Sequence, residues 1–400
     1  MDVLEGIRVL DLSRVLAAPY AGQMLADFGA TVWKVESLQG DDSRNWGEHY
    51  YSAANRGKQS VLVNLKAKAG QEIVRSLAAQ CDVLIENYKV GDLDRYGLGY
   101  EQLNKENPRL IYASVTGFGQ TGPRRLQLGY DTVLQGMTGI MSVTGDPDRP
   151  PAKVGIAWID VMSGLMATIG ILAALRARDQ GGSGQHLDLS LFDVGMAALV
   201  DAGQDCLLNG RVQQRSGSIH RNFAPSEPFR ASDGWVIMAV GNNDQFARLC
   251  AVLGLDALVS DPRFGDNASR LANRQALADL LAPVFRTRSR DDWIAACSAG
   301  KVPLSPIYDV QEALQDAQGL VRRTVWELAQ TDGSSMRTLA NPLQHMSATP
   351  PRPAGPVPRA GEHTARVLAE ALNFDRSALD TLARAGVIAG AGLPQAEVTA

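Results

Sequence analysis

Short apolar runs alternate with amphipathic segments along the first third of the chain. The apolar runs are rich in β-branched residues and predict strands at residues 7–12, 31–36, 60–65, 83–86 and 110–115. Residues 19–28 and 70–80 predict helices, since Ile73, Val74 and Leu77 fall on one helical face. Strands that alternate with helices favour parallel pairing with right-handed crossovers. The predicted fold class is therefore α/β with a doubly wound parallel sheet.

The pattern changes in the second half of the chain. Residues 131–178 are mostly helical in pattern, and residues 185–191 return to strand alternation. The segment 227–240 contains a Ser232-Asp-Gly turn between two strand-like arms, which predicts a hairpin. We therefore expect a discontinuous large domain formed by residues 1–205 and 325–400. A linker at residues 206–225 leads to a smaller α+β domain at residues 226–324.

Composition narrows the classes of partner. The chain has 400 residues, of which 45% are hydrophobic and 20% are charged, as in ordinary soluble globular proteins. Its net charge of −4 argues against a nucleic-acid-binding protein or a polybasic membrane protein. A polyanionic small ligand stays possible, because a local group of cations can lie on a mildly acidic protein.

Cysteine use and segment hydropathy predict a cytoplasmic location. The four cysteines lie far apart, which is typical of a reduced intracellular protein, and the N-terminal residues lack the pattern of a secretory signal. The longest uncharged stretch, Val161–Leu175, is shorter than the roughly 20 residues of a membrane span and predicts a buried core helix. The histidines show no zinc-binding spacing, so we expect no metal site.

A glycine motif and an aspartate each allow two interpretations. Gly117–Gly122 matches GxGxxG after a predicted strand, but Pro123 follows and no apolar helical face begins there. A mobile glycine loop near a site is favoured over a dinucleotide site. Asp160 precedes the apolar stretch, so it is either an N-cap or a carboxylate nucleophile, and both roles can hold at once.

Other polar residues have weaker signals. In a doubly wound sheet, cations near strand ends can bind phosphates, although many are ordinary surface charges. Tyr130 and Asp131 are either site residues or structural, and Gly241–Phe246 is interpreted as a helix-capping loop. The cations near predicted strand ends are Lys34, Arg44, Arg56, Lys58, Lys66 and Arg95.

Seven segments, in order along nearly the whole chain, resemble the class III CoA-transferases, a family that also contains α-methylacyl-CoA racemases. The segments are Leu4–Pro19, Asn55–Ser60, Val83–Tyr88, Ser114–Pro123, Gly155–Gly164, Gly241–Phe246 and Val302–Ile307. The resemblance implies a Rossmann-like large domain and a small domain, with ring-shaped monomers interlocked as a homodimer. It also implies that Asp160 attacks the donor acyl-CoA to give an aspartyl mixed anhydride, without ATP or a metal.

The resemblance assigns coenzyme A contacts to some positions of this chain, while other family positions are occupied by different residues. It assigns adenine binding to the turn formed by Val63, Asn64, Leu65 and Lys66, and further contacts to Asn87 and Arg95. Leu16 and Tyr130 also fall on family site positions. Leu16, Ser37 and Leu128 replace the Gln, Arg and Lys of formyl-CoA transferases, which argues against formyl-CoA and oxalate as substrates.

Reaction and substrate are inferred from the same resemblance. Tyr130 stands where the racemases have a His, and a phenol suits proton abstraction poorly, so a transferase is favoured over a racemase. A CoA-binding protein without turnover is a third hypothesis. Similarity to succinate–hydroxymethylglutarate CoA-transferases implies succinyl-CoA as donor and a short dicarboxylate as acceptor: itaconate first, then malate, mesaconate, glutarate or hydroxymethylglutarate. Arg44, His220 and Arg221 are the expected partners of the acceptor's distal carboxylate.

Overall fold

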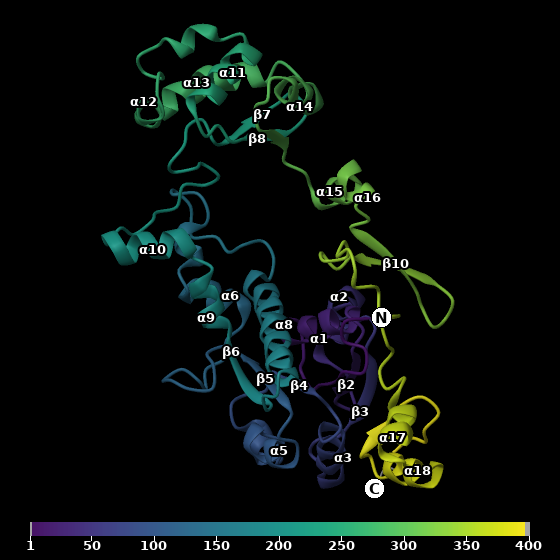
Figure 1. Cartoon of the computed structure of the whole chain (residues 1–400). Helices are drawn as coiled ribbons and strands as arrows, with labels where there is room; N and C mark the ends of the chain where they lie inside the picture. The colour runs from purple at the N-terminus through teal and green to yellow at the C-terminus, as the bar shows by residue number, and fades with distance from the viewer. Residues whose placement is uncertain (1, 397–400) are drawn as a thin grey trace. The chain divides into compact units, whose positions relative to one another are not determined.

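The computed structural model describes residues 2–396, which divide into two compact units (Figure 1). The first unit contains the chain up to Ile140, Val154–Asn209 and the chain from Gln318 onward. The second unit contains Met141–Lys153 and Gly210–Ala317. Arg215 ties the segment Met141–Lys153 to the rest of the second unit, because its guanidinium donates to the main-chain carbonyls of Asp146, Pro147 and Arg149.

A seven-stranded sheet forms the centre of the first unit, in the order β12-β3-β2-β1-β4-β5-β6. All neighbours pair in parallel except β12, which pairs antiparallel with β3. The predicted α/β class with a largely parallel sheet is therefore confirmed. The strands are β1 (Arg8–Asp11), β2 (Thr31–Glu36), β3 (Gln59–Val63), β4 (Val83–Glu86), β5 (Ile111–Thr116), β6 (Gln185–Ser190) and β12 (Ile388–Ala389).

Helices occupy most of the chain between the strands. They are α1 (Ala17–Asp27), α2 (Glu48–Asn55), α3 (Lys68–Ala78), α4 (Asp92–Arg95), α5 (Tyr100–Glu106), α6 (Asp131–Met137), α7 (Ile140–Val143), α8 (Trp158–Asp179), α9 (Leu191–Ala197), α10 (Val200–Asn209), α11 (Asn243–Leu253), α12 (Asn267–Ala272), α13 (Arg274–Phe285), α14 (Arg290–Ala299), α15 (Val310–Gln315), α16 (Ala317–Val321), α17 (Thr364–Leu372) and α18 (Arg376–Arg384). Two 3₁₀ helices, η1 (Asp42–Trp46) and η2 (Asp256–Val259), complete the set.

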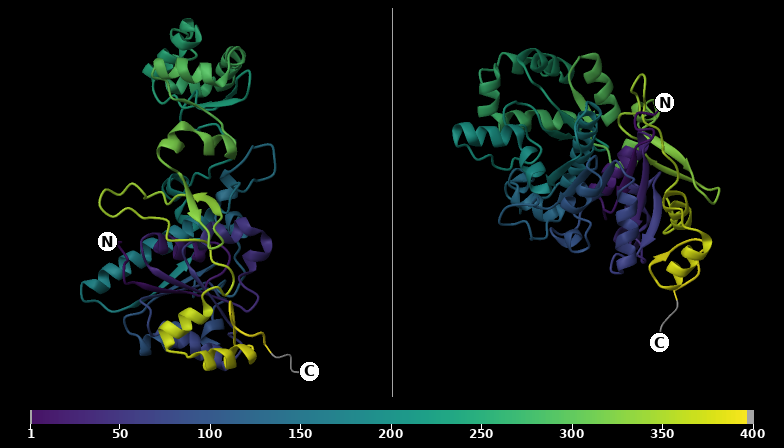
Figure 2. Two further views of the ribbon diagram at one scale, coloured as in Figure 1. Left: turned by 90° about the vertical axis from the view of Figure 1, so that its right-hand side faces the viewer. Right: turned by 60° about the horizontal axis from the view of Figure 1, so that its bottom comes forward.

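Strands β1 to β5 are buried on both faces, which explains their nearly continuous apolar sequences, whereas β6 at the sheet edge is only partly buried. In β1, Val9 packs into a cluster with residues of α1 and α8, and the next residue, Leu10, packs into a second cluster with residues of α3, α17 and α18. Each such side chain contributes about 1.5–3 kcal/mol when fully buried. Of the C-terminal helices, α17 packs against β3 and α3 and α18 packs against β12, at the β12 edge of the sheet (Figures 1 and 2).

Strand order determines where a ligand can bind. The order β3-β2-β1-β4-β5-β6 reverses direction between β1 and β4, so the loops after these two strands diverge and leave a crevice at their carboxyl ends. No helix begins within Gly117–Gly122, because the chain after β5 stays irregular until α6. This agrees with the interpretation of that motif as a loop.

Helix α8 crosses α1 at close range. A Cβ atom on Gly164 would lie 2.6 Å from the carbonyl oxygen of Ala17, so only glycine permits this approach. By length and composition α8 resembles a membrane span, as apolar core helices also do. Ile159, Ser163, Ala167 and other residues of one face are buried, whereas Met166 and Ile169 are exposed in the single chain. The prediction of a buried helix is thus correct for one face only, because the sheet and α1 cover a single side.

The second unit has a core of its own. Its three-stranded antiparallel sheet contains the hairpin predicted around Ser232-Asp-Gly, and helices α11, α13 and α14 share its apolar core. Asn242 caps α11 by accepting a hydrogen bond from the N–H of Gln245, so the interpretation of the 241–246 loop as a capping loop is confirmed. The strands of this sheet are β7 (Pro228–Arg230), β8 (Trp235–Met238) and β9 (Leu304–Pro306). The first unit contains a further antiparallel pair, β10 (Val325–Ala329) and β11 (Ser335–Leu339).

Candidate active site

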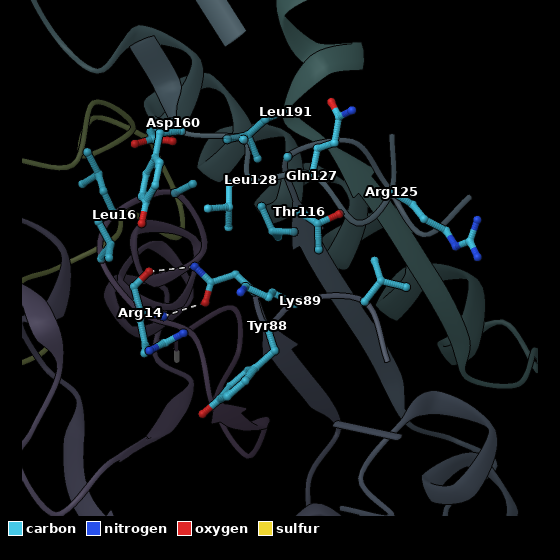
Figure 3. Close-up of a pocket in the computed structure, with 18 of the residues that line it drawn as sticks. Arg14, Leu16, Tyr88, Lys89, Thr116, Arg125, Gln127, Leu128, Asp160 and Leu191 are labelled. Carbon is cyan, nitrogen blue, oxygen red and sulfur yellow. Dashed lines mark hydrogen bonds between the residues drawn. The ribbon is translucent and has the colours of Figure 1, made fainter. Parts of the chain in front are cut away.

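A cavity of about 240 Å³ lies outside the carboxyl ends of β1, β4 and β5, at the reversal in strand order (Figure 3). The loops that follow these strands supply most of its lining, including the long loop from β5 to α6. Asp160 of α8 and Leu191 of α9 complete it. Figure 3 shows Asp160 and Leu16 on one side of the cavity, with Leu128 and Leu191 beside them. The first unit thus brings Leu16, Asn87, Tyr130 and Asp160, all predicted site residues, into one cavity.

A strained turn aims the start of α1 at this cavity. Val15 has φ of 72°, a left-handed conformation that is unusual for a β-branched residue and costs about 1–3 kcal/mol. Asn87 fixes the preceding residue, since its Oδ1 accepts from the N–H of Arg14 at 2.8 Å and its Nδ2 donates to the Arg14 carbonyl at 2.7 Å. The Asn87 amide therefore ties the loop after β4 to the loop after β1 (Figure 3).

Asp160 lies in the first turn of α8 as its third residue, half-buried and facing the cavity. The interpretation of Asp160 as an N-cap is wrong, because Ala157 occupies the cap position. Asp131, the first residue of α6, satisfies this helix end instead. Its Oδ1 accepts from the N–H of Ile159 at 2.8 Å and from the N–H of Asp160 at 3.3 Å.

The surroundings of Asp160 disfavour its charged form. Burial raises the pKa of Asp160 to about 7, and the negative charge of Asp131 contributes in the same direction. The positive end of the α8 dipole favours an anion here, but desolvation outweighs it. A carboxylate with so high a pKa in a ligand-sized cavity is typical of functional sites.

A second cavity of about 380 Å³ lies at the carboxyl ends of β2 and β3. The predicted adenine turn lines it through Val63, Asn64, Leu65 and Lys66. The C-terminal part of the chain holds this turn in place: the N–H of Asn64 donates to Val387 O at 2.8 Å, and its Nδ2 donates to Gly386 O at 3.1 Å.

The two cavities meet at Arg14, Asp42 and Tyr88, which line both. The Arg14 guanidinium lies 3.2 Å from the Asp42 carboxylate and 5.2 Å from the centre of the Tyr88 ring. Both members of this ion pair are well exposed, so the pair is weak and its partners can exchange. An elongated ligand with an anionic middle fits this arrangement.

Two predicted site residues are engaged outside the cavity linings. Arg44 makes a two-point ion pair with Glu36, at 2.7 and 2.8 Å, and lies 3.5 Å from the centre of the Tyr51 ring. Its guanidinium is therefore committed within the fold. Arg95 is exposed and pairs with Asp92 of its own short helix α4.

The remaining predicted residues belong to the second unit. His220 is exposed, and its Nδ1 accepts a hydrogen bond from the N–H of Asn222 at 3.1 Å. Arg221 is half-buried next to it. The expectation that both residues bind the acceptor stays a prediction.

Several cavity residues were not predicted from the sequence. Arg14 directly follows the first strand, a position that the rule for doubly wound sheets marks as ligand-facing, so this signal was present. Lys89 follows β4 in the same way. Arg125 also lines the cavity, but in Figure 3 its guanidinium points away from Asp160.

Known proteins resemble this chain over nearly its whole length. It is 42% identical over 389 residues to a succinate–glutarate CoA-transferase of Agrobacterium fabrum, an alignment that covers 94% of this chain and 97% of that protein. It is 34% identical over 394 residues to a succinyl-CoA–D-citramalate CoA-transferase of Chloroflexus aurantiacus, covering 96% and 98%. The crystal structure of a CaiB/BaiF family protein from Brucella suis superposes with a TM-score of 0.86 at 41% identity, covering 92% of this chain and 99% of that one.

The family assignment follows from these similarities together with a family model. The model described as CoA-transferase family III matches residues 4–364. The structural match to the Brucella suis protein extends over the same fold, with its large, mostly parallel sheet. The chain therefore belongs to CoA-transferase family III and is a class III CoA-transferase.

Proposed function

We propose that this enzyme moves coenzyme A from succinyl-CoA to a five-carbon dicarboxylic acid, with Asp160 as covalent nucleophile. The observation that carries the proposal is the position of the Asp160 carboxylate, half-buried in a cavity that meets a second cavity at Arg14. The named relatives act on glutarate and D-citramalate, which are both five-carbon dicarboxylic acids. Itaconate, the acceptor that we expect from the sequence, belongs to the same class.

The reaction needs only acyl transfers between groups of similar activation. An Asp160 oxygen attacks the thioester carbonyl of succinyl-CoA, the C–S bond breaks, and CoA leaves as the thiolate. The acceptor carboxylate then attacks the Asp160 carbonyl of the mixed anhydride and releases succinate. Finally the thiolate attacks the acyl carbon of the acceptor, which forms the new thioester and returns Asp160 as a carboxylate.

The two cavities support a position for coenzyme A in this proposal. The adenosine would lie in the second cavity against the Val63–Lys66 turn, with the 3′-phosphate near Lys66. Arg14 would exchange its Asp42 partner for the diphosphate, where a guanidinium can form bidentate bonds. The pantetheine arm would then reach Asp160 past Leu16, Leu128 and Tyr130, which line the cavity with mainly apolar surface.

The acceptor's second carboxylate requires a cation. Lys89 and Arg14 line the Asp160 cavity, whereas Arg44 is paired with Glu36. We therefore add Lys89 to His220 and Arg221 as a third candidate for binding this carboxylate. A Lys89→Met variant should raise the KM for the dicarboxylate and leave the KM for succinyl-CoA nearly unchanged.

Trapping the intermediate tests the proposal. Incubation of the enzyme with succinyl-CoA and hydroxylamine should convert Asp160 to a hydroxamate, which peptide mass spectrometry can locate. Turnover should then be measured with glutarate, itaconate, mesaconate, citramalate and malate as acceptors. Labelling at another carboxylate, or none during turnover, contradicts the role of Asp160.

Two further outcomes identify the alternative functions. Deuterium exchange at the α-carbon of a 2-methylacyl-CoA, without any acceptor acid, would indicate a racemase. Tight binding of coenzyme A without exchange on any acid of the panel would indicate a binding protein without turnover.

A further inference from the structure

Helix α6 presents two buried polar side chains, one turn apart, to the segment that leads into α8. Asp131 accepts the N–H groups of Ile159 and Asp160 through Oδ1, and its Oδ2 accepts from Gln135 Nε2 at 2.6 Å. Gln135 Oε1 in turn accepts the N–H of Val154 at 2.8 Å. Both side chains are buried, so these bonds are shielded from competing water. The α6 pair thus fixes the backbone from Val154 to Asp160.

Among the residues that the structure describes, Asp131 is the charged group that raises the pKa of Asp160. Three donors compensate the Asp131 carboxylate, namely two N–H groups and the Gln135 amide. Burial raises the pKa of Asp160, and the negative charge of Asp131 raises it further.

We infer that Asp131 is the positioning residue of this enzyme: it holds the first turn of α8 in place and, by its charge, makes the Asp160 carboxylate a stronger nucleophile. The inference rests on the proposed nucleophilic role of Asp160. A more basic carboxylate attacks a thioester faster. The free energy of the mixed anhydride that it forms is also closer to that of the thioester. The hydrogen bonds supply the geometry that such an attack requires.

Other charged or titratable groups also face the cavity. Tyr88 is half-buried, and burial raises the pKa of its phenol, so it stays neutral. The others are exposed to solvent, namely Arg14, Asp42, Lys89, Arg125 and Tyr130. Water screens exposed charges strongly, whereas the buried Asp131 carboxylate is screened far less. We therefore expect Asp131 to control the ionisation of Asp160 more than any of these groups.

Two substitutions separate the charge of Asp131 from its hydrogen bonds. Asp131→Asn keeps an oxygen for the Ile159 and Asp160 N–H groups and removes the charge. It also loses the bond from Gln135, because its Nδ2 would face the Gln135 Nε2 donor. Gln135→Met keeps the charge and removes the bonds to Val154 and to Asp131. In Asp131→Asn the acidic limb of the kcat/KM profile should move about one unit toward lower pH, because Asp160 then ionises more easily. In Gln135→Met the acidic limb of the kcat/KM profile should stay at the wild-type pH, while kcat falls.

Expected rates complete the test. Asp131→Asn should lower kcat about tenfold with little change in the KM for succinyl-CoA, since the bound donor is not contacted. Asp131→Ala, which removes both charge and bonds, should lower kcat about a hundredfold or more. Thermal unfolding of each variant checks the fold, and Asp131→Asn keeps the test valid if Asp131→Ala does not fold.

Hydroxylamine trapping distinguishes failure of this inference from failure of the proposed function. If Asp160 is labelled in every variant but the Asp131→Asn pH profile coincides with the wild-type profile, Asp131 is only a structural residue and the inference is overturned. If Asp160 is never labelled in the wild-type enzyme, the nucleophile itself is wrongly assigned.

Discussion

Two carboxylates near the carboxyl ends of the parallel strands, the buried Asp11 and the half-buried Asp160, have opposite electrostatic surroundings. Asp11, at the end of β1, is fully buried, with Lys58 Nζ at 2.7 Å and Lys34 Nζ at 4.0 Å. Burial alone would raise the pKa of Asp11, but the two lysines outweigh it and hold the pKa below its usual value. Asp160 has the Asp131 carboxylate as its close charged neighbour, and its pKa is raised to about 7.

The difference separates a structural charge from a reactive one. Lys58 keeps its charge at neutral pH although burial lowers its pKa to about 8, and it also donates to Asn55 and to the Pro19 carbonyl. The Asp11 group therefore has compensated charges and stable geometry. Asp160 keeps an uncompensated carboxylate, which costs stability and gives reactivity. Substitutions in the two groups should have opposite consequences for stability and activity.

Replacing Asp160 should have the largest effect on activity. Asp160→Asn removes the nucleophile and should lower kcat by on the order of 10³-fold or more. Its free energy of unfolding should stay unchanged or rise, because a partly buried charge is lost. Steady-state kinetics and urea unfolding measure both effects. Asp179→Asn, at the exposed end of the same helix, is the control and should keep wild-type activity.

Replacing Lys58 should have the largest effect on stability. Lys58→Met leaves the Asp11 carboxylate buried with one distant lysine, and it should lower the free energy of unfolding by about 3–5 kcal/mol. Urea unfolding measures the change, with Lys105→Met as an exposed control. An unchanged unfolding midpoint in Lys58→Met would show that the Asp11 group is not structural.

The pH profile should reflect the raised pKa of Asp160. The attacking form is the carboxylate, so kcat/KM should rise about tenfold per pH unit below pH 7 and level off above it, provided that Asp160 governs the limb. Asp11 should add no limb in this range, because its pKa lies below the usual value. A rate that stays constant from pH 7 to pH 5 contradicts the electrostatic description of Asp160.

Replacing Arg14 should give the smallest effect. Arg14→Ala removes the cation between the two cavities and should raise the KM for succinyl-CoA about tenfold with little change in kcat. Asp42→Asn is the matched variant: it frees Arg14 from its present partner and should lower this KM or leave it unchanged. Equal increases in both variants would indicate that the ion pair, not the free guanidinium, supports binding.

The fold was largely predictable because the local patterns agree with the tertiary structure. Strand β2, at residues 31–36, lies where the apolar pattern places it, and helix α3 (Lys68–Ala78) lies within two residues of its predicted range. In both cases a short periodic segment lies between clear turn signals. Burial of both faces of strands β1 to β5 also explains why these strands read as continuous apolar runs.

The site was predictable only in part, because its geometry depends on contacts between distant residues. Asp131 caps a helix that begins 27 residues later, and nothing near Asp160 in the sequence marks that contact. Arg44 looks like a free cation in the sequence, but the short η1 helix turns it back onto Glu36. Leu16 and Asn87 came from family resemblance, and the structure places both in the Asp160 cavity.

The hydrogen bonds from Asn64 to Val387 and Gly386 have a consequence for biosynthesis. The wall of the second cavity needs residues from the far end of the chain, and β12 covers the edge of β3 only after those residues exist. A ribosome must therefore translate the chain beyond Val387 before the proposed nucleotide pocket can close. Prematurely terminated chains should then bind coenzyme A poorly, even when they already contain Asp160.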